Sequence, residues 1–322
     1  MLKLEPVSVE AVRAARERID RLVLRTPLVR LNLDEAPAEI FLKLENLQPI
    51  GSFKLRGAGN AIAAADPAAL AHGVYTASAG NMAQGVAWHA RRLGLPCTVI
   101  VPEHAPETKL AAIERLGGKV VKVPFSTWWQ VLVDRSFPGM PGHFIHPVSD
   151  PLVMAGNGTI ALEILEDLPE VETVIVPYGG GGLSCGIAAV LRALRPATKV
   201  YACEVETAAP LAASLAAGSP QSIDHTPSFV DGIGGRAVLE EMWPLASSLL
   251  AGSLVVSLAE VASALRLLAE RNRVIAEGAG AASVAAALTG KAGKGRVVCV
   301  VSGGNIDAGK LARILQGEVP PA

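Results

Sequence analysis

Cysteine is scarce in this chain: there are four in 322 residues, and no two of them form a CxxC pair. Three of the four lie inside apolar, strand-like runs, a pattern typical of buried free thiols in a reducing compartment. Their scatter excludes a thiol–disulfide redox motif and a cysteine-based zinc site. The N-terminal stretch MLKLEPVSVE lacks the apolar core of a signal peptide, so we expect a cytoplasmic protein.

A charge imbalance and long apolar runs are also missing. Lysine and arginine total 29 and aspartate and glutamate 30, which gives a formal net charge of −1. Such a balance provides no electrostatic footprint for binding nucleic acid or an anionic membrane. No apolar stretch approaches the roughly 20 residues that a membrane-spanning helix needs. We therefore expect neither nucleic acid nor membrane among the partners.

What the chain does contain is a regular alternation of β-branched runs and Ala/Leu-rich segments. Strand-like runs cover residues 41–45, 73–78, 97–102, 119–124, 172–177, 199–206 and 296–301. Helical patterns lie between them, for example at 81–94, 106–117 and 258–272. Apolar strands separated by helices predict parallel sheets covered on both faces, an α/β fold. Within it, we expect residues 72–147 to form a compact βαβαβ unit, and residues 1–71 with 148–322 to build a larger sheet.

Lys54 stands in the segment NLQPIGSFKLRGAGNA (46–61), after a strand-like run and a turn that contains proline and glycine. We expect Ser52 to cap a helix at this point. A cation in the first turn opposes the helix dipole, so a purely structural residue here would more often be acidic. An amine held in a crevice can lose its charge by desolvation and become a carbonyl nucleophile. A surface lysine near a helix start is the alternative.

Four consecutive glycines at 179–182 join an apolar strand-like run to the helical pattern LSCGIAAVLRAL. Because they lack Cβ atoms, they can turn successive N–H groups toward an anion at a helix N-terminus. The segment is neither GxGxxG nor GxxxxGK[ST], so it matches neither a dinucleotide fingerprint nor a P-loop. A tight turn for close packing is the alternative. Four glycines in a row cost too much backbone entropy for packing alone, which favours phosphate binding.

Two further polar turns follow strand-like runs. In TASAGNMAQG (76–85), Ser78 and Asn81 stand where backbone N–H groups could bind a carboxylate, although ordinary helix capping explains the same residues. In VVCVVSGGN (297–305), Ser302 ends an apolar strand at its carboxyl end, where open α/β sheets bind ligands. The Ser302 hydroxyl could bind a ring nitrogen, or it could simply form a turn.

These four motifs together describe a pyridoxal phosphate site. Between Thr26-Pro27 and Asn305, the chain resembles the threonine/serine dehydratase branch of the fold-type II pyridoxal phosphate enzymes, with all four motifs in the expected order. The resemblance implies a fold similar to the tryptophan synthase β subunit, in which two open parallel-sheet α/β domains hold pyridoxal 5′-phosphate in the cleft between them. Residues 1–71 plus 148–322 would be the large cofactor-binding domain, and 72–147 the small mobile domain. We also expect a homo-oligomer, either a dimer or a tetramer.

The resemblance also implies a role for each motif residue. Lys54 would hold the cofactor as a Schiff base, with Phe53 beside the ring and Asn81 on the phenolic oxygen. The phosphate would be held by Gly179, Gly180, Gly181 and Gly182, followed by Leu183. Ser302 would face the pyridine nitrogen. The substrate carboxylate would be surrounded by Ser78, Ala79, Gly80 and Met82. Glu277 matches an acidic position near the cofactor edge, with an ordinary helix-start carboxylate as the alternative.

The predicted reaction is α,β-elimination of water from a small β-hydroxy-α-amino acid of the L-threonine or L-serine type, giving a 2-oxo acid and ammonia. A hydroxyl at Ser302 is too weak an acid–base partner to keep the pyridine protonated, so the cofactor becomes a weaker electron sink. Early loss of a β-leaving group suits such a site. Lys54 would take the Cα proton, and the cofactor phosphate would help the hydroxyl to depart.

Other activities on the same fold match less well. Racemases of this branch carry a second serine base where this chain has Ala79. Synthases that replace the β-substituent, such as cysteine synthases, usually have a threonine in the phosphate loop and an Asn-Thr where this chain has Asn81-Met82. Non-catalytic ligand-binding proteins on this fold typically lose the lysine or the glycines, and this chain keeps both.

An alternative is the same elimination specialised for an amino acid with a bulky β-substituent, such as a phenylserine. Met82 and the pair Trp128-Trp129 could line the pocket, or they could simply belong to the core. We predict no metal site. The family's divalent-cation site would use Glu204 and the Ala208 carbonyl, but its third position, an acid in cation-binding relatives, is Pro210 here. Two oxygen ligands alone hold Mg²⁺ or Ca²⁺ poorly.

Overall fold

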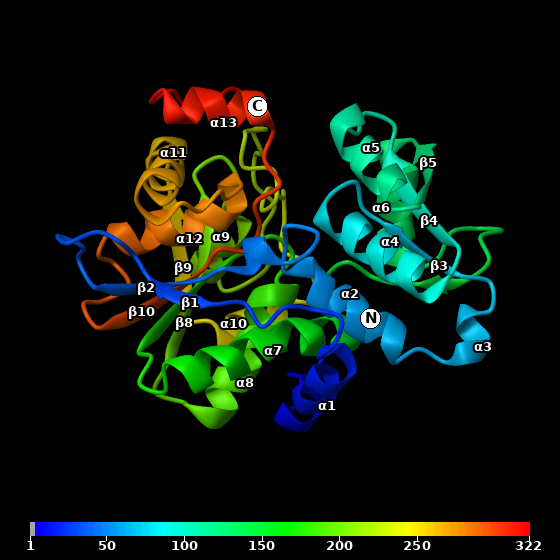
Figure 1. Cartoon of the computed structure of the whole chain (residues 1–322), viewed down its shortest axis with the longest axis horizontal. Coiled ribbons are helices and arrows are strands. Elements are labelled where there is room, and N and C mark those ends of the chain that lie inside the picture. Colours follow the sequence, from blue (N-terminus) through cyan, green and yellow to red (C-terminus); the bar gives the residue numbers. More distant parts are fainter. Residues whose placement is uncertain (1–3) are drawn as a thin grey trace.

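The computed structural model describes residues 4–322, and its strands form two separate sheets (Figure 1). The larger sheet has the order β1-β2-β10-β7-β8-β9 and the smaller sheet the order β5-β4-β3-β6. The larger sheet consists of β1 (Leu28–Arg30), β2 (Glu39–Lys43), β7 (Thr173–Pro177), β8 (Lys199–Val205), β9 (Gly252–Val256) and β10 (Arg296–Val300). The smaller sheet consists of β3 (Val74–Ala77), β4 (Cys97–Pro102), β5 (Lys119–Val123) and β6 (His143–Phe144). Only the β1–β2 pair is antiparallel among the described strands, and the predicted α/β class is confirmed.

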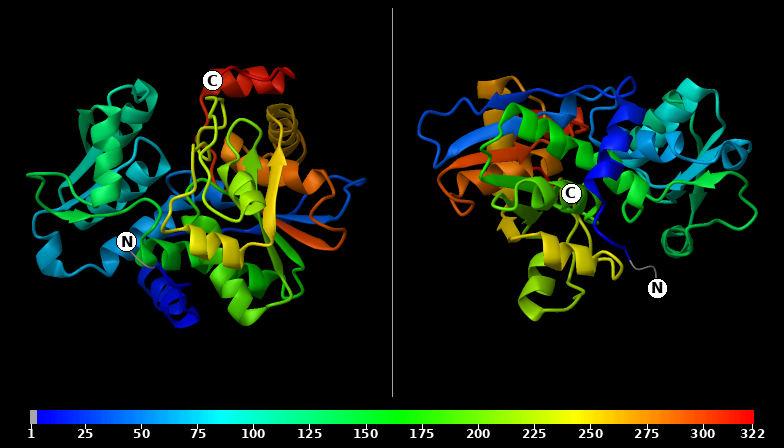
Figure 2. Two further views of the ribbon diagram at one scale, coloured as in Figure 1. Left: turned by 180° about the vertical axis from the view of Figure 1, so that it is seen from behind. Right: turned by 90° about the horizontal axis from the view of Figure 1, so that it is seen from below.

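Helices cover both faces of each sheet (Figures 1 and 2). One face of the larger sheet packs on α11 (Leu258–Leu267) and α12 (Gly278–Leu288), with α13 (Ala308–Leu315) outside them. Its other face packs on α1 (Val9–Ile19), α7 (Pro151–Asp167), α8 (Gly182–Leu194) and α10 (Trp243–Leu249). The smaller sheet lies between α4 (Asn81–Leu93) with α5 (Glu107–Arg115) on one face and α6 (Phe125–Asp134) on the other. Helix α2 (Lys54–Ala63) lies between the two sheets, and the short helices are α3 (Pro67–Leu70) and α9 (Pro210–Ala217).

Several boundaries differ from the sequence-based expectations. Strands β1, β6 and β9 were not expected, because each is short or mixes polar residues into the run. Helix α11 ends at Leu267 and continues as a π-helical turn at Leu268–Asn272.

The expected cap at Ser52 is wrong by one position, since Phe53 is the N-cap of α2. Ser52 instead pairs with Gly303 in an isolated antiparallel bridge, so a tertiary contact fixes its backbone. Its hydroxyl still accepts a hydrogen bond from the Lys54 N–H at 3.3 Å.

A buried ionic network joins α2 to α7 and to the segment that follows β2. The Arg56 guanidinium donates two hydrogen bonds to Glu45, both of 2.8 Å, and two to Glu163, of 2.6 and 2.9 Å. Lys43 Nζ donates to Glu163 at 2.5 Å and to the Thr26 carbonyl at 2.6 Å. Arg56 and Glu45 are at most 1% exposed. Two cations and two carboxylates thus balance inside the protein, as buried ions require.

Replacing Arg56 by Met should leave the buried Glu45 carboxylate without its cation and Glu163 with Lys43 alone. We expect the free energy of unfolding to fall by about 3–5 kcal/mol, measured by urea denaturation. The matched control is Arg16→Met, which removes an ion pair with Glu166 whose side chains are 40% and 42% exposed. That surface change should cost under about 1 kcal/mol. Equal losses in the two variants would show that the buried network is no more important than a surface pair.

Candidate active site

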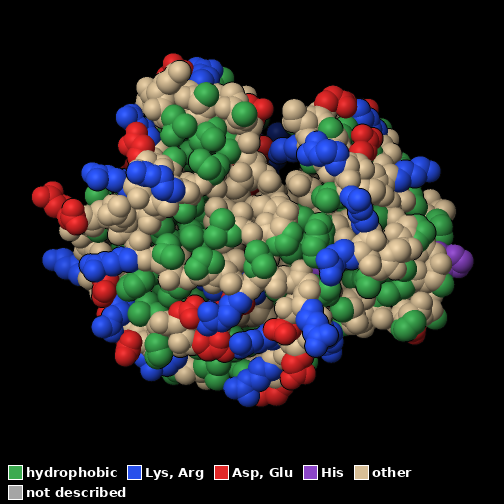
Figure 3. All heavy atoms as spheres, viewed as in Figure 1, with side chains coloured by type: hydrophobic (Ala, Val, Ile, Leu, Met, Phe, Trp, Pro, Cys, Tyr) green, Lys and Arg blue, Asp and Glu red, His purple; other side chains and the backbone are tan. Residues whose placement is uncertain are grey.

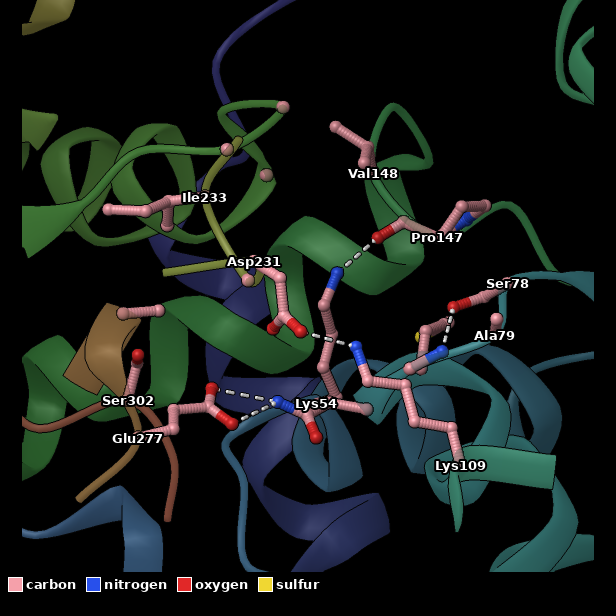
Figure 4. Close-up of a pocket in the computed structure, with 18 of the residues that line it drawn as sticks. Lys54, Ser78, Ala79, Lys109, Pro147, Val148, Asp231, Ile233, Glu277 and Ser302 are labelled. Atoms are coloured by element: carbon pink, nitrogen blue, oxygen red, sulfur yellow. Dashed lines mark hydrogen bonds and ion pairs between the residues drawn. The ribbon is translucent and has the colours of Figure 1, made fainter. Parts of the chain in front are cut away.

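The predicted site residues line one cavity of about 490 Å³ between the two sheets (Figure 4). The cavity lies at the carboxyl ends of β3, β7 and β10, where open α/β sheets place their ligands. Among its lining residues are Phe53, Lys54, Ser78, Ala79, Gly80, Asn81, Met82, Gly179, Gly180, Gly181, Gly182, Leu183, Glu277 and Ser302. Every predicted site residue therefore reaches this cavity, and the surface between the two halves of the molecule is visibly hollowed (Figure 3).

Lys54 begins helix α2 and extends its amine into the cavity (Figure 4). Nζ donates a hydrogen bond to the Pro147 carbonyl at 2.6 Å and lies 5.3 Å from the centre of the Phe53 ring. Burial lowers the pKa of the Lys54 amine from 10.5 to about 8, because the charged form loses its hydration. A useful fraction of the amine is then unprotonated and nucleophilic near neutral pH.

The four glycines at 179–182, here called the glycine loop, join β7 to helix α8, and at two of them a side chain would collide with Val148. A Cβ on Gly180 would lie 2.6 Å from Val148 Cγ1, and one on Gly182 would lie 2.5 Å from the Val148 carbonyl oxygen. Gly181 is the N-cap of α8 and has φ +97°, a conformation that side chains disfavour. The unpaired N–H groups of the first turn of α8 border the same cavity, so the loop suits an anion such as phosphate.

Asn81 and Glu277 both line the cavity and are joined by a hydrogen bond. Asn81 Nδ2 donates to Glu277 Oε1 at 2.9 Å, and Asn81 Oδ1 accepts from Asn305 at 2.8 Å. Burial raises the pKa of Glu277 to about 7, against the opposing effect of the Asn81 hydrogen bond. Glu277 is the N-cap residue of α12, but its carboxylate does not cap the helix. The side chain therefore serves the cavity instead of the helix start.

Ser302 follows β10 and is only 3% exposed. Its backbone carbonyl accepts from the Phe53 N–H at 3.0 Å, which ties it to the start of α2. Within residues 4–322, the Ser302 hydroxyl forms no hydrogen bond to the protein. A nearly buried hydroxyl that borders the cavity without a protein partner is available to a ligand. Ser78 differs, since its hydroxyl accepts from the Gly80 N–H at 3.2 Å, as an ordinary turn would require.

Sequence reasoning missed several cavity residues. Lys109 on α5, which packs on the smaller sheet, forms an ion pair of 2.7 Å with Asp231 in the loop before α10 (Figure 4). Pro147 and Val148 were also missed, although they follow strand β6. A two-residue strand gives little sequence signal, and the long loop at 218–242 gives none. Of the tryptophan pair, Trp128 lines the cavity, whereas Trp129 is 44% exposed.

The Glu204 carboxylate, considered above for a cation site, already has three protein donors. It accepts from the N–H groups of Leu211 and Ala212 at 2.9 and 2.8 Å and from the Ser253 hydroxyl at 2.6 Å. In the part of the chain that the structure describes, no three His, Cys, Asp or Glu side chains are grouped closely enough to hold a metal ion. Within residues 4–322, no helix combines the length and apolar character that crossing a membrane would require.

Substituting Gly182 by Ala should close part of the phosphate-binding space, because the new Cβ meets a backbone oxygen that cannot rotate away. We expect the dissociation constant for pyridoxal 5′-phosphate to rise by roughly tenfold or more, measured by absorbance titration of cofactor-depleted protein. Gly235→Ala is the matched control, since the nearest atom to a Cβ there is 3.9 Å away. Equal affinity in the two variants would contradict a phosphate site at the glycine loop.

Comparison with known proteins gives a consistent result. The family described as pyridoxal-phosphate dependent enzyme matches residues 19–303. The chain is 38% identical over 314 residues to the L-threonine ammonia-lyase of Thermotoga maritima, covering 96% of this chain and 78% of that protein. It is 36% identical over 316 residues to the catabolic L-threonine dehydratase of Escherichia coli, covering 96% of each.

Solved structures agree with these sequence matches. A maize serine racemase superposes with a TM-score of 0.89 at 31% identity, over 97% of this chain and 98% of that one. A processed threonine deaminase isoform from Solanum lycopersicum has a TM-score of 0.83 at 29% identity, over 98% of this chain and 96% of that one. The chain belongs to the pyridoxal-phosphate dependent enzyme family and depends on that cofactor.

Proposed function

We propose that this chain removes water from a β-hydroxy-α-amino acid of the L-threonine or L-serine type, releasing a 2-oxo acid and ammonia. The observation that carries the proposal is Lys54, a desolvated amine that shares its cavity with the glycine loop and Ser302. The relatives named L-threonine ammonia-lyase and L-threonine dehydratase support the same class of substrate.

The cavity fits the cofactor. The glycine loop at the start of α8 would hold the phosphate, Lys54 would bind the aldehyde carbon, and the unpartnered Ser302 hydroxyl would bind the ring nitrogen. Asn81 would bind the phenolic oxygen, with Phe53 beside the ring and Glu277 at the edge. When bound, pyridoxal phosphate supplies the electron sink that acidifies the Cα proton of an amino acid.

Residues of the chain carry out proton transfer and hold the substrate. Lys54 takes the Cα proton, and the Pro147 carbonyl accepts a hydrogen bond from the ammonium that results. The segment Ser78–Met82 at the start of α4 holds the substrate carboxylate through its backbone N–H groups. The methyl group of Ala79 offers no acid or base, so proton transfer at Cα is limited to the Lys54 face. One-sided proton removal favours elimination over racemisation.

Residues 72–147, which carry the smaller sheet, are the part that we propose to move. The Lys109–Asp231 ion pair joins residues 72–147 to the rest of the chain at the cavity, where closure would exclude water. A homo-oligomer, dimer or tetramer, stays a prediction.

Lys54→Ala should lose the absorbance band of covalently bound cofactor and lower 2-oxo acid formation from L-threonine and L-serine by at least about a thousandfold. The physical reason is that one amine both attaches the cofactor and acts as the base. The measurement is a coupled assay for 2-oxo acid together with the visible spectrum. Release of racemised amino acid instead of a 2-oxo acid by the parent enzyme would contradict the proposal.

Lys119→Ala, at an exposed position on β5, is the matched control and should retain both signals. The pH dependence of cofactor attachment provides a second check. Attachment needs the unprotonated amine, so its rate should rise with pH through about 8 and level off above it. For an exposed lysine, the rate of attachment would keep rising up to about pH 10.

A second candidate is the same elimination on a β-hydroxy amino acid with an aromatic substituent. Phe125 and Trp128 of α6 both line the cavity, with ring centres 5.5 Å apart. If they hold the substituent, kcat/KM should be higher for L-threo-phenylserine than for L-serine, and Trp128→Ala should reduce that preference by roughly tenfold. Trp129→Ala, outside the cavity, is the control. A clear preference of the parent for serine would exclude this candidate.

A further inference from the structure

The turn at residues 146–149 follows β6 and is organised by the ring of His146. This ring is 3% exposed, and its Nδ1 accepts hydrogen bonds from the N–H groups of Val148 at 3.2 Å and Ser149 at 2.9 Å. Because backbone N–H groups can only donate, Nδ1 must be unprotonated. The proton therefore sits on Nε2. Burial and the nearby cations Arg135 and Lys54 lower the pKa of His146 to about 3, so the ring stays neutral.

The same turn touches both parts of the cavity that must hold the cofactor. The Pro147 carbonyl accepts the hydrogen bond from Lys54 Nζ at 2.6 Å (Figure 4). The next residue, Val148, occupies the space that Cβ atoms on Gly180 and Gly182 would need. Two consecutive residues thus contact the amine and the glycine loop, and the turn sets the spacing between them.

The far end of the turn has further anchors besides His146, whose Nδ1 also lies 3.2 Å from the Ser149 hydroxyl. Arg135 Nη2 donates to the Ser149 carbonyl at 2.8 Å and to its hydroxyl at 2.7 Å, and that hydroxyl donates to Glu241 at 3.0 Å. These contacts hold Ser149 in place but leave the N–H groups inside the turn to His146. Without an acceptor at the Nδ1 position, those N–H groups would have to find other partners, and the turn would open.

We propose that His146 is a positioning residue for Lys54: its Nδ1 holds the 146–149 turn closed, so that the Pro147 carbonyl aims the amine and Val148 fixes its distance from the glycine loop. The geometry supports this because the Lys54 amine has one protein acceptor among the described residues, and that acceptor belongs to this turn. The rate of a reaction depends steeply on how its reacting groups are oriented. The effect on turnover rests on the proposed function, whereas the effect on cofactor orientation does not.

The test compares two amides at position 146 in the cofactor-loaded enzyme. Asn places its amide where Nδ1 lies and can keep the acceptor, whereas Gln places its amide near Nε2. For His146→Asn, we expect the visible circular dichroism of the bound cofactor, kcat and KM to stay near those of the parent. For His146→Gln, most of the cofactor ellipticity should be lost and kcat should fall by roughly ten- to a hundredfold, with KM within about threefold.

His89 offers a matched control with the opposite pattern. It is 1% exposed, and its Nε2 donates to the Leu55 carbonyl at 2.8 Å, away from the turn. Here Gln is the conservative replacement, and His89→Asn should lower the melting temperature without changing cofactor ellipticity. A His89→Asn variant that lost the cofactor signal as fully as His146→Gln would overturn the proposal, since any buried histidine would then matter equally.

The other outcomes are equally decisive. If the Asn and Gln variants at 146 behave alike, whether both intact or both impaired, His146 has no positioning role. Should His146→Gln fail to fold, His146→Ala gives the same comparison, because a small side chain removes the acceptor without adding a misplaced amide. A parent enzyme that shows the cofactor band but forms no 2-oxo acid would refute the proposed function, while the ellipticities would still decide the role of His146.

Discussion

The ion network around Arg56 is the constraint on which the site depends. Arg56 lies two residues after Lys54 on α2, and its planar fork is shared between Glu45, beyond β2, and Glu163, on α7. An unpaired charge in this interior would be costly, so all three groups must meet in one arrangement. That requirement leaves α2 a single rotation and register, and the direction in which Lys54 leaves the helix follows from it. A reactive lysine at a helix start is thus positioned by a second cation that never reaches the cavity.

Close backbone approach extends this constraint to the phosphate site. A Cβ on Gly156 of α7 would lie 2.5 Å from the Arg56 carbonyl oxygen and 2.8 Å from Gly57 Cα, so α2 and α7 touch at a glycine of each helix. One residue further along α7, Asn157 donates to the Gly182 carbonyl at 3.3 Å. The sequence GNGT therefore joins the lysine helix to the glycine loop, although Gly156 and Asn157 do not line the cavity. Amine and phosphate site are spaced by packing between helices, and the 146–149 turn adds a third contact between them.

The sequence could reveal the parts of this site that follow strong apolar strands. Strands β4, β7 and β10 lie within one residue of their predicted runs, and the motifs after β3, β7 and β10 all reach the cavity. Lys109, Asp231 and Pro147 could not be predicted in the same way, because they meet the site only through contacts between the two sheets. Ser52 failed as a cap for a related reason: its pairing with Gly303 comes from a segment some 250 residues away, and no local propensity records it. Local sequence patterns locate the ends of strands. Contacts between distant segments determine which residues face those strand ends across the cavity.

The charges around Lys54 bear on why its amine suits proton removal. The buried carboxylate of Glu277 is engaged by Asn81, and Asp231 is engaged by Lys109. The Lys54 amine donates to the neutral Pro147 carbonyl, and burial lowers the pKa of the amine. A carboxylate in place of that carbonyl would stabilise the ammonium and return the pKa toward that of an ordinary lysine. A base works best when its pKa lies near the working pH. Because Glu277 and Asp231 are paired with other groups, the pKa of Lys54 stays near neutral pH. The same amine can then take a proton and later release it.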